Sequence, residues 1–260
     1  MSTSHDVIIH SSEDFIGMRE AGAVASKILD YVAPFVQIGT TTEELNKLCH
    51  TEILRLKSVP APLNYKGFPK SICTSINNVV CHGIPGETML QDGDIINIDV
   101  TVIKNGWHGD TSRMYCVGKQ KPLTRLLIKT CYDSMMKAIN IIRPGVALNM
   151  IGKVIQKHSE KRGFSIVRDY CGHGIGKTFH ALPNVLHYFC PEDHTIIEEG
   201  MFFTVEPMIN IGKYNTKVLS DQWTVVTRDC SLSAQFEHTI GVTKNGCEIF
   251  TKSSQEPMFH

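Results

Sequence analysis

Carboxylates end two strand-like runs of this sequence at matching positions. Gly93 precedes Asp99 by six residues in GDIINID, and Gly200 precedes Glu206 by six residues in GMFFTVE. Asp and Glu are poor strand formers, and unpaired carboxylates that lie close together repel each other. Each acid taken alone is compatible with an exposed or salt-bridged strand residue. Their repeated placement favours a site that holds something positive.

The first of these acids lies in a segment whose pattern is typical of a β-hairpin. Apolar residues alternate along DIINIDVTVIK, and the following Asn105-Gly106 favours a tight two-residue turn. Such a turn pairs Lys104 with Trp107, Thr101 with Asp110, and Asp99 with Ser112. Because side chains alternate between the faces of a strand, Asp99, Thr101 and Asp110 share the polar face. As diagonal neighbours, Asp99 and Asp110 lie within roughly 7 to 8 Å at the backbone.

The second half of the chain supplies two further acids. Glu206 ends MFFTVE, and Glu237 lies in QFEHTIGVT, where Gln235, Glu237 and Thr239 face away from the apolar side. Two divalent cations would neutralise the four carboxylates, and the imidazole of His173 would complete an oxygen-rich ligand set. Such ligands suit Mn²⁺, Fe²⁺, Co²⁺ or Zn²⁺ without choosing among them. Two ions about 3.5 to 4 Å apart can activate a water and polarise a carbonyl or phosphoryl oxygen, which predicts a hydrolytic site.

A glycine-rich stretch, YCGHGIGKTFHALPNV at 170–185, has the look of a phosphate-binding loop. That loop needs a glycine five residues before Gly176, so that consecutive backbone amides can wrap the phosphates, and Cys171 stands there instead. The stretch also carries His173 and His180, which a phosphate cradle does not use. We therefore assign it to the hydrolytic site, with glycines that let the backbone pass close to the metal ions.

Composition excludes several classes of protein. The chain has 260 residues, of which 42% are hydrophobic, so it can bury a core. Lys plus Arg and Asp plus Glu number 26 each, so net charge indicates neither a specific DNA partner nor an anionic membrane. The nine cysteines lack paired CxxC spacing and are typical of reduced thiols. With no secretory signal at the N-terminus and no apolar stretch of about 18 residues, we expect a cytoplasmic protein.

The order of the expected elements repeats along the chain. In each half, two helix-like runs precede a glycine-rich motif and a strand-like run that ends in an acid, with the helices expected at 14–33, 42–57, 123–142 and 148–162. This order favours duplication over chance similarity, with halves of about 8–118 and 119–250 in a single catalytic domain spanning 1–260. It predicts an α+β fold, in which helices pack on the outer side of a curved, largely antiparallel sheet with approximate two-fold internal symmetry.

Five segments together resemble the motif set of the type I methionine aminopeptidases, which adopt the pita-bread fold and remove initiator Met. They are SINNVVCHGIPG, GDIINIDVTV with GWHGDTSRM, YCGHGIGKTFHALPNV, GMFFTVEPMI and QFEHTIGVT. The length is similar to that of the short bacterial form. The resemblance implies a monomer that acts on N-terminal Met peptides and nascent chains, with a preference for a small second residue.

The resemblance also implies roles for individual residues. The ligands of two divalent ions would be Asp99, Asp110, His173, Glu206 and Glu237, with Asp110 and Glu237 bridging the ions. A metal-bridged hydroxide would attack the scissile carbonyl, and Glu206 would carry the proton to the leaving nitrogen. His180 would hydrogen-bond the developing oxyanion, and His82 would contact the scissile amide nitrogen. Outside such a motif, His82 and His180 would be structural histidines.

An apolar cup for the Met side chain is implied as well, formed by Tyr65, Phe68, Cys73, Phe179 and Trp223. Aromatic and sulfur neighbours suit a thioether, although each of these residues is also compatible with a plain core role. The sequence departs from the family pattern at Pro62, Lys66 and Phe68, where Cys, His and Tyr are usual. These departures concern the rim of the site and fine specificity.

Several features carry no motif. We expect His108 to lie behind the ligands or at the surface, and His158, His187 and His194 to face solvent. The basic run KQKPLTRLLIK at 119–129 is compatible with transient docking on ribosomal RNA or with a solvated helix face. Two other functions stay open: a proline-directed peptidase of the same fold, whose relatives usually carry a large N-terminal domain, and a metal-free binding module, which the five filled ligand positions disfavour.

Overall fold

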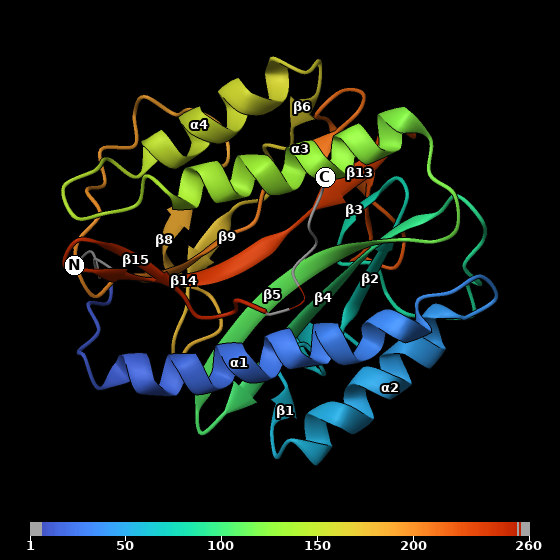
Figure 1. Cartoon of the computed structure of the whole chain (residues 1–260), viewed down its shortest axis with the longest axis horizontal. Coiled ribbons are helices and arrows are strands. Elements are labelled where there is room, and N and C mark those ends of the chain that lie inside the picture. Colours follow the sequence, from blue (N-terminus) through green and yellow to red (C-terminus); the bar gives the residue numbers. More distant parts are fainter. Residues whose placement is uncertain (1–6, 254, 256–260) are drawn as a thin grey trace.

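In the computed structural model of the chain, which describes residues 7–253 and 255, four α-helices cover the sheet system (Figure 1). Two come from each half of the chain, and their bounds are α1 Asp14–Val32, α2 Thr42–Arg55, α3 Pro122–Ile139 and α4 Asn149–Glu160. Each begins within one residue of its predicted start. In the view of Figure 1, α1 and α2 lie below the sheet strands, and α3 and α4 lie above them. The predicted pair of helices in each half is therefore present in the structure.

The main sheet has nine strands and is antiparallel throughout. Its order is β1-β4-β5-β14-β9-β7-β8, with β2 added beside β4 and β15 beside β14. The bounds are β1 Val59–Pro60, β2 Cys73–Ile76, β4 Ile95–Lys104, β5 Trp107–Cys116, β7 Gly172–Gly174, β8 Ala181–Val185, β9 Phe202–Val205, β14 Glu237–Thr243 and β15 Gly246–Ile249. Because β14 pairs with β5 on one side and with β9 on the other, it joins the two halves.

Two small three-stranded sheets complete the architecture. One consists of β13 (Ser233–Gln235), β10 (Met208–Asn210) and β6 (Ser165–Ile166), and the other of β11 (Thr216–Val218), β12 (Val225–Thr227) and β3 (Val79–Cys81). The second sheet draws β3 from the first half of the chain and two strands from the last third. Short 3₁₀ turns lie at Ala33–Phe35 and Tyr65–Gly67.

Local sequence explains where two of the helices begin. The Thr41 side chain accepts the Glu44 backbone amide, and the Glu44 side chain accepts the Thr41 amide, which is a capping box at the start of α2. Pro122 occupies the first turn of α3, where its missing N–H costs no helical hydrogen bond. Both signals confirm helices that apolar spacing alone had indicated.

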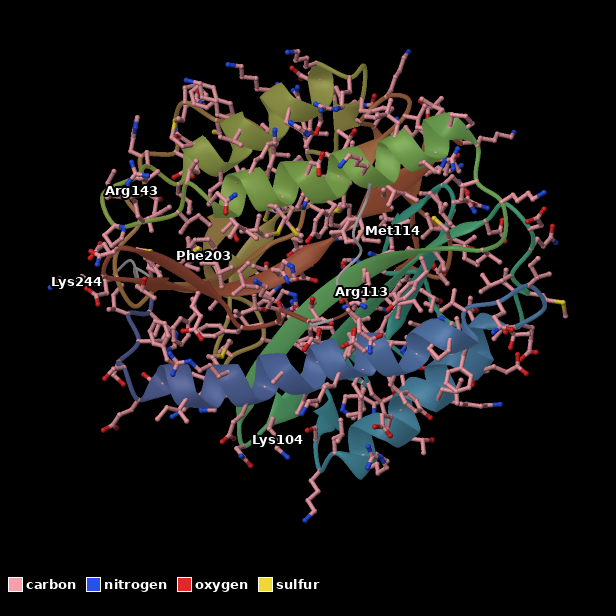
Figure 2. All side chains as sticks on the ribbon, viewed as in Figure 1. Lys104, Arg113, Met114, Arg143, Phe203 and Lys244 are labelled. Carbon is pink, nitrogen blue, oxygen red and sulfur yellow. The ribbon has the colours of Figure 1, made fainter. Side chains whose placement is uncertain are left out.

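Each half has its own hydrophobic core between helices and sheet. One core packs α1 and α2 on β4 and includes Ile28, Leu45 and Ile98, and the other packs α3 and α4 on the C-terminal strands and includes Leu127 and Phe203. Figure 2 shows Phe203 inside the molecule, whereas Arg143 and Lys244 point outward at its edge. The helices thus hold the sheet from the outside and leave its concave face for polar residues.

All nine cysteines are free thiols, as expected from their spacing. None of the helices in the described part of the chain combines the length and apolar character that crossing a bilayer requires.

Candidate metal centre and active-site cleft

The β4–β5 hairpin places two carboxylates on one face, in the predicted register. Lys104 pairs with Trp107, Thr101 with Asp110, and Asp99 with Ser112. Asp110 is almost fully buried, and its Oδ1 accepts a hydrogen bond of 2.7 Å from the Thr101 hydroxyl. On the neighbouring strand β14, the Thr239 hydroxyl donates to the Asp110 carbonyl at 2.6 Å. Asp110 is therefore fixed by both halves of the chain.

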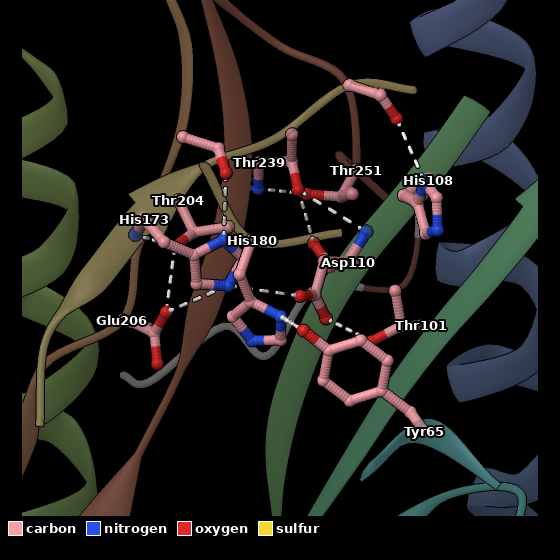
Figure 3. A network of polar contacts seen from close by, with 12 residues as sticks. Tyr65, Thr101, His108, Asp110, His173, His180, Thr204, Glu206, Thr239 and Thr251 are labelled. Atoms are coloured by element: carbon pink, nitrogen blue, oxygen red, sulfur yellow. Dashed lines mark hydrogen bonds and ion pairs between the residues drawn. The ribbon is translucent and has the colours of Figure 1, made fainter. Parts of the chain in front are cut away.

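His173 on β7 faces this hairpin from the second half (Figure 3). Its Nε2 lies 3.6 Å from Oδ2 of Asp110 and 3.8 Å from Oε1 of Glu206. Its Nδ1 lies 3.1 Å from the Gly174 carbonyl, which can only accept, so the proton resides on Nδ1 and Nε2 keeps a free lone pair. Burial lowers the pKa of His173, but the carboxylates of Asp110 and Glu206 outweigh it, and the net shift is upward.

Glu206 and Glu237 complete the ring of acids. Glu206 follows β9, and its carboxylate accepts from the Thr204 hydroxyl at 2.7 Å and from the Gln235 amide at 3.2 Å. Glu237 begins β14 opposite Ser112. Ligand atoms of Asp110, His173 and Glu237 all lie within 4.8 Å of one another. The two halves thus bring His173, Asp110 and Glu237 within ligand distance of one another, and Asp99 and Glu206 line the same cleft.

The electrostatics of these acids fit a cation. Burial raises the pKa of Asp99 and Glu237 far above the ordinary carboxyl value, and neighbouring carboxylates add to the rise. Burial also raises the pKa of Glu206 to about 7. Oδ1 of Asp99 is buried and has no hydrogen-bond partner among the described residues. Because a buried oxygen without a partner is costly, these groups fit a divalent metal that supplies the missing positive charge.

Two glycines of the 170–185 stretch lie close to the backbone of neighbouring strands. A Cβ on Gly172 would lie 2.4 Å from the Thr204 carbonyl oxygen, and a Cβ on Gly174 would lie 2.0 Å from that of Leu182. At these two positions, a side chain would collide with the backbone of a neighbouring strand. The two glycines let β7 pack tightly between its neighbouring strands, which holds His173 in place.

A cleft of about 380 Å³ opens over the acids, and the residues predicted for catalysis, metal binding and the Met cup all line it. Tyr65 and Phe179 have ring centroids 4.9 Å apart, and Phe68 meets Trp223 edge to face at 5.2 Å. Cys73 lies next to Asp99 on the paired strand β2. The cleft therefore has an acidic floor and an aromatic side wall.

His82 and His180 stand on the walls of this cleft. His82 adopts a left-handed backbone conformation with φ of 56° in the loop after β3, and burial lowers its pKa. Nδ1 of His180 lies 3.0 Å from the Tyr65 hydroxyl, and the His180 and His173 ring centroids are 4.2 Å apart. Burial, reinforced by the nearby His173, lowers the pKa of His180 to about 4. Both imidazoles are therefore neutral near pH 7.

Sequence reasoning missed the supporting role of Thr204 and left His108 either behind the ligands or at the surface. The hydroxyl of Thr204 accepts the His173 amide and donates to Glu206, and His108 stacks on Phe179. The TVE context of Thr204 carried no separate signal, since its role depends on strand pairing. For His108, the structure gives a buried position with Nδ1 2.9 Å from the Gly176 carbonyl.

Two of the three histidines expected to face solvent do not. His158 is 9% exposed on α4, and His187 is fully buried behind Glu206; only His194 is exposed. The isolated positions of His158 and His187 gave no periodic signal for burial. His158 lies on α4, and His187 lies in the segment packed against this helix. Contacts between segments distant in sequence therefore decide how far each side chain is exposed.

Comparisons with known proteins identify the family. A model of the metallopeptidase family M24 matches residues 16–244, and the chain belongs to this family. Within it, the chain groups with the methionine aminopeptidases. That of Rickettsia prowazekii is 58% identical over 95% of this chain and 96% of its own length, and that of Escherichia coli is 50% identical over 94% of each.

Solved structures of methionine aminopeptidases are also similar to this chain. The crystal structure of the Rickettsia prowazekii methionine aminopeptidase covers 95% of this chain and 100% of its own, with a TM-score of 0.93 and 57% identity. That of the Thermotoga maritima methionine aminopeptidase also gives a TM-score of 0.93, at 33% identity. A prolidase from Pyrococcus furiosus shares the fold at 20% identity, and the chain covers 66% of it. The predicted pita-bread fold is confirmed, and family membership implies dependence on a divalent metal.

Proposed function

We propose that this protein removes the N-terminal methionine from peptides and nascent proteins whose second residue is small. The observation that carries the proposal is the aromatic wall beside the acidic floor in one cleft. An apolar side chain fits against this wall while the adjoining peptide bond lies over the acids. The methionine aminopeptidase names of its relatives support the same substrate.

We assign two divalent ions to the site. Asp99, Asp110, His173, Glu206 and Glu237 would hold them, with Asp110 and Glu237 shared between the ions. Four carboxylates balance the charge of two such ions, and one imidazole is compatible with Co²⁺, Mn²⁺, Fe²⁺ or Zn²⁺. When bound, such a pair activates a water and polarises the scissile carbonyl.

The side chains around the ions would transfer the proton and hydrogen-bond the substrate. Glu206, with a pKa of about 7, suits a group that accepts a proton and passes it to the leaving nitrogen, because such a carboxylate exchanges protons readily at neutral pH. His180 can donate to the oxyanion, and His82 can contact the scissile amide nitrogen. As neutral rings, both can donate and accept one hydrogen bond each.

The cup accounts for methionine as the favoured first residue. Tyr65, Phe68, Phe179 and Trp223 supply aromatic surfaces, and Cys73 supplies sulfur. Lys66 is exposed at the rim of the cleft, where it would contact residues of the substrate beyond the first. A preference for a small second residue follows if the side chain after methionine points at the crowded floor of the cleft.

In its setting, we propose a cytoplasmic monomer that meets its substrates as they leave the ribosome. The exposed basic residues of 119–129 are one surface for transient contact with ribosomal RNA. Retained sedimentation with ribosomes at low salt, lost at high salt, would support this contact, and free sedimentation at every salt concentration would exclude it.

An activity assay tests the function. Purified protein freed of metal with a chelator and reloaded with Co²⁺ or Mn²⁺ should release methionine from Met-Ala-Ser and leave Ala-Pro-Ser intact. Cleavage of the proline peptide alone would favour a proline-directed peptidase. Failure to bind metal, with no release from either peptide, would favour a metal-free binding module.

A further inference from the structure

His187 is buried directly behind the metal centre and has no part in the chemistry outlined above. Its Nε2 accepts a hydrogen bond of 3.1 Å from the backbone amide of Glu206, and its side chain is fully shielded from solvent. Because an amide can only donate, Nε2 is the acceptor and the ring proton resides on Nδ1. Nδ1 has no partner among the described residues, so the contact to Glu206 is the polar interaction that orients this ring.

The position of Glu206 makes this contact consequential. Glu206 follows the last residue of β9 and precedes Pro207, so it lies where the chain leaves the sheet. Thr204 and Gln235 hold the two carboxylate oxygens of Glu206, but neither holds its backbone. The amide bond to His187 fixes the main chain from which the carboxylate projects.

The segment that carries His187 is itself clamped to α4. A Cβ on Gly152 would lie 2.2 Å from the Tyr188 carbonyl oxygen and 2.7 Å from that of Leu186, so the helix backbone rests directly on the chain at both sides of His187. The Phe189 amide also donates to the Gln156 side chain at 2.9 Å. His187 is therefore a rigid acceptor held by the outer helix layer.

We propose that His187 is a positioning residue that aligns Glu206 for metal binding and proton transfer. This inference rests on the proposed function of Glu206. Partners behind metal ligands commonly change metal affinity or activity by about 10- to 100-fold when removed. In this proposal, it is the hydrogen-bond acceptor Nε2 of His187, and not the size of its ring, that aligns Glu206.

Three substitutions separate these properties. In His187→Gln, the amide oxygen reaches roughly the place of Nε2 and retains the acceptor. His187→Asn places its oxygen one bond short, and His187→Phe keeps the ring but removes both nitrogens. His158→Asn is the matched control, because His158 is buried like His187 but lies on α4 and contacts Arg162 rather than the site.

The readouts are kcat and KM on Met-Ala-Ser, and Mn²⁺ affinity by calorimetry, all below the unfolding temperature of each variant. We expect His187→Asn and His187→Phe to lower kcat or Mn²⁺ affinity by about tenfold or more, with KM changed by less than about threefold. His187→Gln should stay within about threefold of the natural protein, and His158→Asn should lose stability without losing kcat.

A folded His187→Phe protein with natural kcat and Mn²⁺ affinity would overturn the proposal, as would a His187→Gln protein as impaired as His187→Phe. If His187→Asn fails to fold, the comparison of His187→Phe with His187→Gln is sufficient to test the proposal. If the natural protein releases no methionine with any metal, the proposed function fails, whereas Mn²⁺ affinity still decides whether His187 aligns Glu206.

Discussion

Nε2 of His173 lies 3.6 Å from Oδ2 of Asp110, although the two residues belong to opposite halves of the chain. Asp110 comes from the first hairpin and His173 from the glycine-rich stretch of the second half, and β14 lies between β5 and β9 in the sheet that carries both residues. Neither half contains the ligand set by itself. The proposed metal centre thus lies between the two halves of the chain.

Glu206→Gln tests the proton carrier. The amide keeps the size of the side chain and can still accept from Thr204, so the fold should be retained. It cannot take up a proton at neutral pH, so kcat should fall by about 10² to 10⁴-fold. Steady-state kinetics on Met-Ala-Ser, with circular dichroism as the control for folding, measures this. A fully active variant would refute the assigned role.

Removing the metal should destabilise the protein as well as stop turnover. Without cations, the carboxylates around Asp99 are buried without a compensating charge and also repel one another, and burial first and repulsion second raise the pKa of Asp99 and of Glu237. At a metal concentration 100 times Kd, binding stabilises the folded state by about 2.7 kcal/mol. Thermal unfolding with and without a chelator should show a lower Tm for the stripped protein, reversed by Mn²⁺. Identical curves would contradict a site that binds metal in the folded state.

Tyr65→Phe tests how His180 is oriented. With the Tyr65 hydroxyl donating to Nδ1, the His180 proton lies on Nε2, from which it can be donated to the substrate oxygen. Loss of this hydrogen bond, worth about 0.5 to 1.5 kcal/mol, should lower kcat/KM several-fold. Tyr214→Phe, outside the cleft, is the control and should change nothing. An unchanged kcat/KM in Tyr65→Phe would show that His180 needs no such partner.

Much of this centre could be predicted from the sequence because its signals are local. The Asn105-Gly106 turn determined the register that places Asp110 beside Asp99, and strand alternation indicated the side on which Glu237 lies. His187 could not be found this way. Its burial depends on α4 lying against residues 186–188, and its partner is a backbone amide, which leaves no trace in residue type.

The pH dependence of stability should reflect His158. Burial, together with the charges of Arg162 and Lys137, lowers the pKa of His158 to about 4, below its ordinary value of about 6.5. Between pH 6.5 and 4, the unfolded chain therefore takes up a proton at His158 that the folded chain does not. The contribution of His158 to the free energy of unfolding is complete above pH 6.5 and is lost as pH falls toward 4.

The comparison is between the natural protein and His158→Gln, both stripped of metal, in urea unfolding at several values of pH. The natural protein should lose stability more steeply than the variant between pH 6.5 and 4. Parallel curves across this range would show that His158 does not titrate differently in the two states.

In the proposed site, five side chains from two halves of the chain would hold a pair of divalent ions. Crystals grown with Mn²⁺ and measured at a wavelength where manganese scatters anomalously test it most directly. We predict two anomalous peaks about 3.5 to 4 Å apart among these five side chains, with Asp110 and Glu237 shared between the two ions. No peak among these five residues in a folded protein soaked with excess Mn²⁺ would contradict the account.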